Sequence, residues 1–119
     1  GLLGARARNM LGLARAAGKI VLGFAKVDAA LSGGSATMLV SACDGARDGR
    51  AKLARKAQAA GVPVMEFFSA KELGLAMGRQ DVIHSAVTEA QWAAKIDEAA
   101  HRWQVYIGTV PSGQVGGQK

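Results

Sequence analysis

The sequence is poor in aromatic residues, proline and cysteine. Of its 119 residues only 5% are aromatic, 2 are proline and 1, Cys43, is cysteine. A single cysteine excludes an internal disulfide framework and a cysteine-rich zinc site. No stretch approaches the roughly 20 consecutive apolar residues of a membrane-spanning helix. No apolar segment followed by a cleavage site marks a secretory signal. These absences favour a cytoplasmic protein that has no membrane partner.

The sequence also lacks an arrangement of side chains suited to catalysis or metal binding. Cys43 follows a strand that we expect to be buried, and no His-Asp pair lies near it, which favours a packed core thiol over a nucleophile. His84 and His101 do not have the spacing of metal ligands, and neither a GxGxxG nor a P-loop motif occurs. We therefore expect no enzyme activity and no cofactor.

Positive charge is concentrated in the first half of the chain. The net charge is +6, with 15 basic and 9 acidic residues, and residues 1–60 hold ten of the basic and three of the acidic ones. A one-sided positive field attracts polyanions, of which nucleic acid is the commonest in the cytosol. A solvated basic surface that only keeps the protein soluble is the alternative, and the charge balance favours nucleic acid.

Glycines divide the sequence into segments whose apolar residues alternate between helical and strand-like spacing. Asn9 and Asp48 are expected N-caps of helices, and Gly18 is an expected left-handed stop. Ser69 with Glu72, and Thr88 with Gln91, match the capping-box pattern at the starts of two further helices. Four strands are expected at 20–22, 38–42, 62–67 and 82–87.

Four strands that alternate with five helices predict a three-layer α-β-α sandwich around a central four-stranded mixed sheet. We expect a core domain over residues 9–88, a C-terminal helix over 89–108 and a flexible tail over 109–119. On the C-terminal helix, one stripe carries the apolar residues Trp92, Ile96, Ala99, Trp103 and Tyr106. Packing of this stripe on the domain itself is favoured over packing on a partner or a second copy.

Three blocks of sequence resemble the ribosomal protein L7Ae/L30e superfamily, in its bacterial branch. The first block is Leu11–Gly23, the second is the apolar strand Met38–Ala42 followed by Cys43 and Asp44, and the third runs from Gly61 to Gly78. The resemblance implies a non-enzymatic protein that binds structured RNA, such as kink-turns or ribosomal RNA, in a role related to translation. Some bacterial members follow a small basic domain, so the start at Gly1 suggests part of a longer chain.

The resemblance places RNA at the turn from the first strand into the second helix. Gly23, Phe24, Ala25 and Lys26 form this turn, and Lys19 and Lys26 add positive charge. A glycine permits close approach of the backbone, and a helix N-terminus presents free amides to phosphates. Two flanking loops are expected at the same end of the sheet, and they contribute Asp44, Arg47, Arg79 and Val82.

Ala25 and Lys26 stand where kink-turn-binding members of the family carry Asn-Glu. A carboxylate can accept hydrogen bonds from guanine, whereas lysine only donates. We therefore expect RNA binding with weak discrimination in favour of kink-turns. The alternative from a different class is a protein-interaction domain of the same fold that has lost specific RNA binding.

Overall fold

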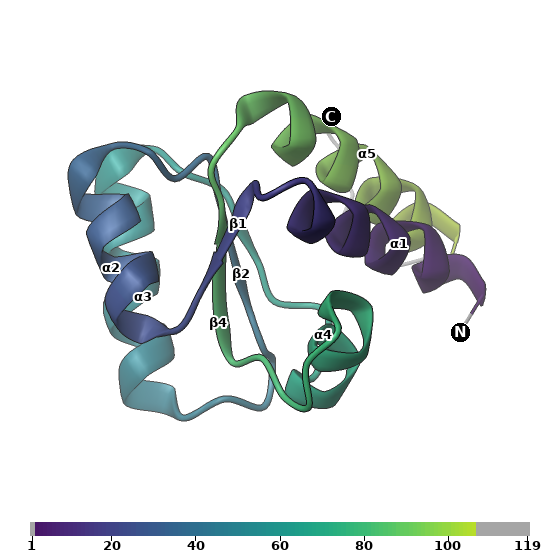
Figure 1. Ribbon diagram of the computed structural model, residues 1–119, viewed down its shortest axis with the longest axis horizontal. Coiled ribbons are helices and arrows are strands. Elements are labelled where there is room, and N and C mark those ends of the chain that lie inside the picture. Colours follow the sequence, from purple (N-terminus) through teal and green to yellow (C-terminus); the bar gives the residue numbers. More distant parts are fainter. Residues whose placement is uncertain (1, 107–119) are drawn as a thin grey trace.

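The computed structural model describes residues 2–106, and it describes the side chains of residues 4–100. Helices and strands alternate along the chain (Figure 1). Their order is α1 (Leu2–Ala16), β1 (Ile20–Leu22), α2 (Phe24–Gly33), β2 (Met38–Ser41), α3 (Arg47–Ala60), β3 (Val64–Met65), α4 (Ala70–Met77), β4 (His84–Val87) and α5 (Ala90–Tyr106). The predicted alternation of four strands with five helices is confirmed for the described residues.

The four strands form one mixed sheet in the order β1-β4-β2-β3. β4 is antiparallel to both of its neighbours, pairing Ser85 with Leu22 on one side and with Val40 on the other. β2 and β3 are parallel, with Leu39 opposite Val64. This order makes β1 an edge strand of the sheet, and the edge lies directly before the turn that we expected to meet RNA.

The helices cover both faces of the sheet, so the predicted three-layer architecture is confirmed. Figure 1 shows α2 and α3 side by side on one face, and α1, α4 and α5 on the other. Side chains alternate between the two faces along each strand: Leu39 and Ala86 pack with α2 and α3, whereas Val40 and Val87 pack with the other three helices. The core therefore has two halves, one on each side of the sheet.

The predicted N-caps Asn9 and Asp48 are both wrong. The first helix begins at Leu2, so Asn9 lies inside it, where Ala7 and Leu11 continue the buried face. The third helix is preceded by Ala46 as its N-cap, and Asp48 lies in its first turn, where a carboxylate still faces the positive helix end. The predicted stop at Gly18 is confirmed by its left-handed φ of 76°.

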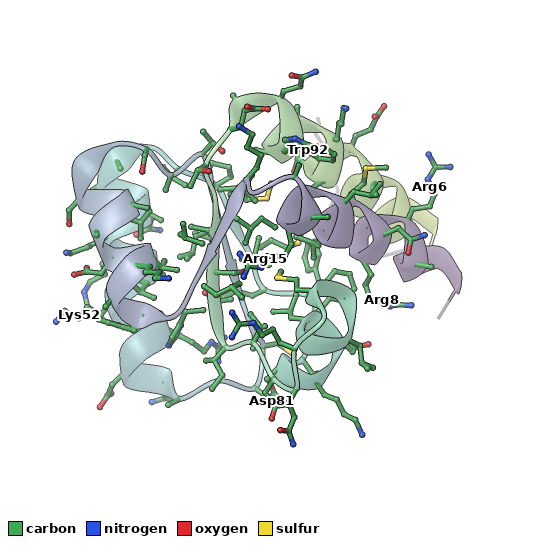
Figure 2. The ribbon with its side chains drawn as sticks, in the orientation of Figure 1. Arg6, Arg8, Arg15, Lys52, Asp81 and Trp92 are labelled. Carbon is green, nitrogen blue, oxygen red and sulfur yellow. The ribbon has the colours of Figure 1, made fainter. Side chains whose placement is uncertain are left out.

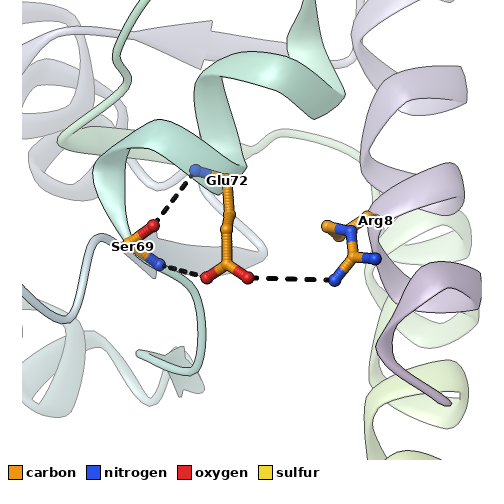
Figure 3. Close-up of polar contacts among 3 residues, drawn as sticks. All are labelled: Arg8, Ser69 and Glu72. Atoms are coloured by element: carbon orange, nitrogen blue, oxygen red, sulfur yellow. Dashed lines mark hydrogen bonds and ion pairs between the residues drawn. The ribbon is translucent and has the colours of Figure 1, made fainter. Parts of the chain in front are cut away.

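The capping box that begins α4 is confirmed, and it also connects α4 to α1 (Figure 3). The Ser69 hydroxyl accepts from the Glu72 amide at 3.1 Å, and the Ser69 amide donates to Glu72 Oε1 at 2.9 Å. The other carboxylate oxygen of Glu72 lies 4.0 Å from Arg8 Nη1 on α1. The Glu72 side chain thus accepts a hydrogen bond from a free backbone amide at the start of α4 and pairs with a cation on α1.

The second expected capping box, at Thr88, is wrong. α5 begins at Ala90, and the Thr88 hydroxyl donates to the backbone carbonyl of Lys19 at 3.2 Å. Three strands are also shorter than expected, because β2 ends at Ser41, β3 covers only Val64–Met65 and β4 begins at His84. Backbone pairing across the sheet, rather than apolar character alone, sets these strand lengths.

α5 packs on the domain, as favoured from the sequence. Ile96 is fully buried, and Trp92 is half-buried against the core on the α1 side of the sheet. The side chains of Trp103 and Tyr106 and the expected tail over 109–119 lie outside the described residues. Cys43, expected in the core, is exposed: Ala42 is the last buried residue after β2, and Cys43 begins the surface loop that leads to α3.

Candidate nucleic-acid interface

Three connecting segments meet at the end of the sheet where β1 leads into α2. The Gly23 amide donates to the carbonyl of His84 at 3.0 Å, which joins the β1–α2 turn to the start of β4. Gly45, in the loop after β2, lies against the Ile83 side chain, because a Cβ at Gly45 would be 2.8 Å from Ile83 Cγ2. The fold therefore brings both predicted flanking loops to the predicted turn.

A groove of about 500 Å³ runs along the free edge of β1 at this end of the molecule. One wall is β1 itself with the start of α2, and the other is the segment between α4 and β4. The side chains along it combine cations, one carboxylate and apolar residues, and they include Arg15, Leu22, Lys26, Arg79, Asp81 and Ile83.

The β1–α2 turn depends on a glycine. Gly23 has φ 96° and ψ 152°, a backbone conformation that residues with a Cβ rarely adopt. No side chain caps α2 at this position, so its first amides are not occupied by a capping side chain. The amides and the partial positive charge of the helix start favour an anion at the end of the groove.

Cations line both walls of this groove. Lys26 and Arg79 are exposed, and neither forms an ion pair with any acidic side chain that the structure describes. Arg15 reaches in from the end of α1, and its Nη1 donates to the carbonyl of Ile20 at 3.1 Å. These charges come from α1, α2 and the α4–β4 segment, so only the folded chain brings them together.

Two aromatic rings lie behind the turn. Phe24 is half-buried and meets the ring of His84 edge to face, with ring centroids 5.6 Å apart. Lys52 on α3 lies over the Phe24 ring, with its Nζ 5.7 Å from the ring centre. Gly49 makes room for the imidazole, since a Cβ there would be 3.2 Å from His84 Nε2. Burial lowers the pKa of His84 below its usual value of 6.5.

The segment between α4 and β4 is held at both of its ends. The Arg79 amide donates to the Gly74 carbonyl at 2.8 Å, and the Val82 amide donates to the Ala70 carbonyl at 3.0 Å. Gly74 permits this close packing, because a Cβ at that position would overlap the backbone carbonyls of Arg79 and Gln80. The cation of Arg79 and the carboxylate of Asp81 are thus carried by a fixed piece of backbone.

The structure brings some of the predicted residues to the groove and places others elsewhere. Gly23, Lys26, Arg79 and Val82 line it, although the side chain of Val82 is buried. Phe24 and Ala25 belong to the turn itself, Phe24 half-buried and Ala25 exposed.

The remaining predicted residues do not line the groove. Lys19 lies at the opposite end of β1 and forms an ion pair with Glu89 at 3.2 Å. Asp44 accepts from the Ala70 amide at 2.8 Å and so fixes its loop to the start of α4. Arg47 is the exposed first residue of α3.

Three polar residues of the groove were not expected from the sequence: Arg15, Asp81 and His84. Arg15 lies in α1, His84 at the start of β4 and Asp81 in the segment before it, and nothing in their local sequence predicts that they meet the β1–α2 turn. Their place depends on the packing of α1 and on the pairing of β4 with β1, for which one sequence carries no local signal.

Two further properties concern the chemistry of the described residues. They hold no group of three or more His, Cys, Asp or Glu side chains placed to bind a metal ion. None of their helices is both long enough and apolar enough to cross a membrane.

Comparison with known proteins agrees with this architecture. A solved structure of a Bacillus halodurans protein of unknown function has a TM-score of 0.79 and 25% sequence identity, covering 82% of this chain and 98% of that chain. The Giardia lamblia 15.5kD RNA binding protein has a TM-score of 0.69 and 17% identity, covering 88% of this chain and 90% of its own, which shows a shared fold. A comparison with curated protein sequences gave no match.

A family model matches residues 5–97, a range that starts inside α1 and ends inside α5. It therefore extends beyond the expected core domain of 9–88 at both ends. The match, the strand order and the arrangement of the helices agree, and the chain belongs to the Ribosomal protein L7Ae/L30e/S12e/Gadd45 family.

Proposed function

We propose that this chain is a non-enzymatic protein that binds structured RNA through the groove beside β1. The observation that carries the proposal is the meeting of Lys26 and Arg79, both exposed and without an acidic partner among the described side chains, at a helix start preceded by Gly23. Phosphates are held by such cations and by free backbone amides. Membership of a family named for ribosomal proteins supports RNA as the polyanion.

The RNA that suits this site is a folded one. A groove of about 500 Å³ accepts a small part of a ligand, such as a nucleotide exposed by a loop or a bend, and cannot enclose a duplex. Kink-turns and related internal loops of ribosomal or other translation-related RNA present nucleotides in this way. Because Ala25 and Lys26 provide no side-chain acceptor, we propose weak discrimination between kink-turns and other folded loops.

Titration at several salt concentrations tests the proposal. If four to six phosphates are neutralised, the logarithm of the affinity falls with the logarithm of the salt concentration at a slope of roughly −3 to −5. Removing two phosphate contacts by Lys26→Ala with Arg79→Ala should reduce the magnitude of this slope by roughly 1.4 to 1.8.

A matched control removes the same charges from another part of the surface. Arg6 and Lys95 line a separate depression between α1 and α5, and Figure 2 shows Arg6 far from the end of the molecule that holds Asp81. Arg6→Ala with Lys95→Ala should leave the slope unchanged. If both double variants reduced the salt slope equally, the groove would not be where the phosphates bind.

The second candidate function is the protein-interaction domain that the sequence left open. Two exposed leucines favour it, since Leu13 is 53% exposed and Leu75 is 74% exposed beside a groove between α1 and α4. The same titration separates the two candidates. A chain that binds folded RNA no more tightly than other polyanions, or without dependence on salt, would favour protein interaction.

A further inference from the structure

Asp81 stands out among the residues that line the groove. It lies in the segment between α4 and β4, its side chain is exposed, and Figure 2 shows it at the end of the molecule beside α4. Among the described residues along the groove it is the one that carries a carboxylate, and the others with charge, Arg15, Lys26 and Arg79, are cations.

The Asp81 carboxylate has its hydrogen-bonding capacity available. It forms no ion pair and accepts no hydrogen bond from the side chains and backbone that the structure describes. The three cations nearby attract a phosphate backbone, so an RNA held by them brings its bases close to this acceptor. A lone carboxylate would weaken phosphate binding by repulsion, and its presence in a cationic groove therefore points to a different partner.

The backbone holds Asp81 in position before any ligand binds. Hydrogen bonds from the amides of Arg79 and Val82 to carbonyls of α4 lie on either side of it. The close approach of this segment to Gly74 adds a steric limit to its movement. Because the backbone of Asp81 is held in this way, only its short side chain has to be ordered on binding, which favours specific recognition.

Among the four bases, guanine matches a carboxylate best. Its Watson–Crick edge presents two adjacent donors, the N1–H and the 2-amino group, and a carboxylate presents two adjacent acceptors. Adenine and cytosine each place an acceptor beside their donor, and uracil places acceptors on both sides of its N3–H. Unpaired bases in RNA loops are the ones whose Watson–Crick edges proteins can reach.

We infer that Asp81 is a specificity-determining residue that accepts two hydrogen bonds from an unpaired guanine, while Lys26 and Arg79 hold the flanking phosphates. This inference rests on the proposed RNA-binding function. It assigns the acceptor to the α4–β4 segment rather than to α2, because Ala25 has no polar group and Lys26 only donates.

Hairpin RNAs that differ in one loop nucleotide test the inference. The probes share one stem and a uridine loop with a central guanine, adenine or inosine, and each is titrated at one fixed salt concentration. The unchanged protein should bind the guanine loop about tenfold or more tightly than the adenine loop. Inosine, which keeps the N1–H and lacks the 2-amino group, should fall between them.

Asp81→Asn should bring the guanine-to-adenine ratio close to one, with equal or tighter binding of the adenine loop because a negative charge is gone. Asp97→Asn, the same change on the exposed surface of α5, should keep the ratio of the unchanged protein. Asp81→Glu retains the carboxylate on a longer side chain and should keep part of the preference.

The outcomes separate this inference from the proposed function. Salt-dependent binding with no guanine preference, or a preference that survives in Asp81→Asn, would overturn the role of Asp81 and leave RNA binding in place. Failure of the unchanged protein to bind any of the hairpins would overturn the proposed function, and the role of Asp81 with it.

Discussion

Replacing Gly74 with alanine tests whether the fixed α4–β4 segment positions the side chains that we propose to bind RNA. A Cβ at Gly74 would lie closest to the Gln80 carbonyl oxygen, and it would be 2.7 Å from the Gln80 carbonyl carbon and 2.8 Å from the Arg79 carbonyl oxygen. Ordinary van der Waals contact begins at 3.4 Å, so the Arg79 carbonyl oxygen must retreat by 0.6 Å and the Gln80 carbonyl oxygen by more. These atoms belong to the backbone, and their movement carries the side chains of Arg79 and Asp81 with it.

The effect on stability is the difference between two opposing terms. Alanine in a helix interior is favoured over glycine by about 1 kcal/mol, and overpacking a well-packed site costs about 1–3 kcal/mol. We expect the free energy of unfolding to fall by about 0–2 kcal/mol. Displacement of two contact residues should weaken RNA binding several-fold, measured by titration at a temperature well below the melting point.

Gly12→Ala is the matched control. Gly12 also lies in a helix, and its Cβ would be 2.6 Å from the Ala76 carbonyl oxygen. This contact joins α1 to α4, away from the groove beside β1. Gly12→Ala should therefore lose similar stability and keep its RNA affinity. Equal losses of affinity in the two variants, or full affinity in Gly74→Ala, would refute a positioning role for the segment.

Two further predictions concern the turn and its aromatic neighbour. Ala25→Asn with Lys26→Glu supplies an amide and a carboxylate, each worth about 1–3 kcal/mol of base discrimination, so binding of a kink-turn over a plain duplex should improve at least tenfold. Tight and selective kink-turn binding by the unchanged protein, in the same titration, would contradict this. Because burial lowers the pKa of His84, the unfolded chain binds more protons, and the stabilising contribution present above pH 6.5 is lost as the pH falls below it. Between about pH 7.5 and 5.5 the urea midpoint of unfolding should fall less in His84→Gln than in the unchanged protein. An equal fall in both proteins would show that His84 does not cause the loss of stability.

Much of the fold could be predicted because its signals are local. The Gly18 stop and the Ser69–Glu72 capping box involve residues within one helical turn, and the structure confirms both. Asn9 and Thr88 have the same local appearance as caps. The first is overridden because the apolar face of α1 continues past it, and the second because its hydroxyl bonds to Lys19, far away in the sequence.

The site was predictable only where it coincides with one turn. Gly23 and Lys26 are neighbours in sequence, so a strand followed by a helix was enough to place them together. Arg15 and Asp81 join them through the packing of α1 and the pairing of β4 with β1, which no local spacing encodes. Lys19 is the converse case: it is close to the turn in sequence, but the length of β1 carries it to the other end of the sheet.

The free edge of β1 has a consequence for how the protein behaves when it is concentrated without RNA. An unpaired strand edge can accept a strand from another copy, which is a common route to aggregation. Here the edge is 3 residues long, and Arg15 already occupies the carbonyl of Ile20. Bound RNA would lie over the remainder of this edge. Occupation of the groove should thus protect the chain from self-association, so that bound RNA also raises the solubility of the protein.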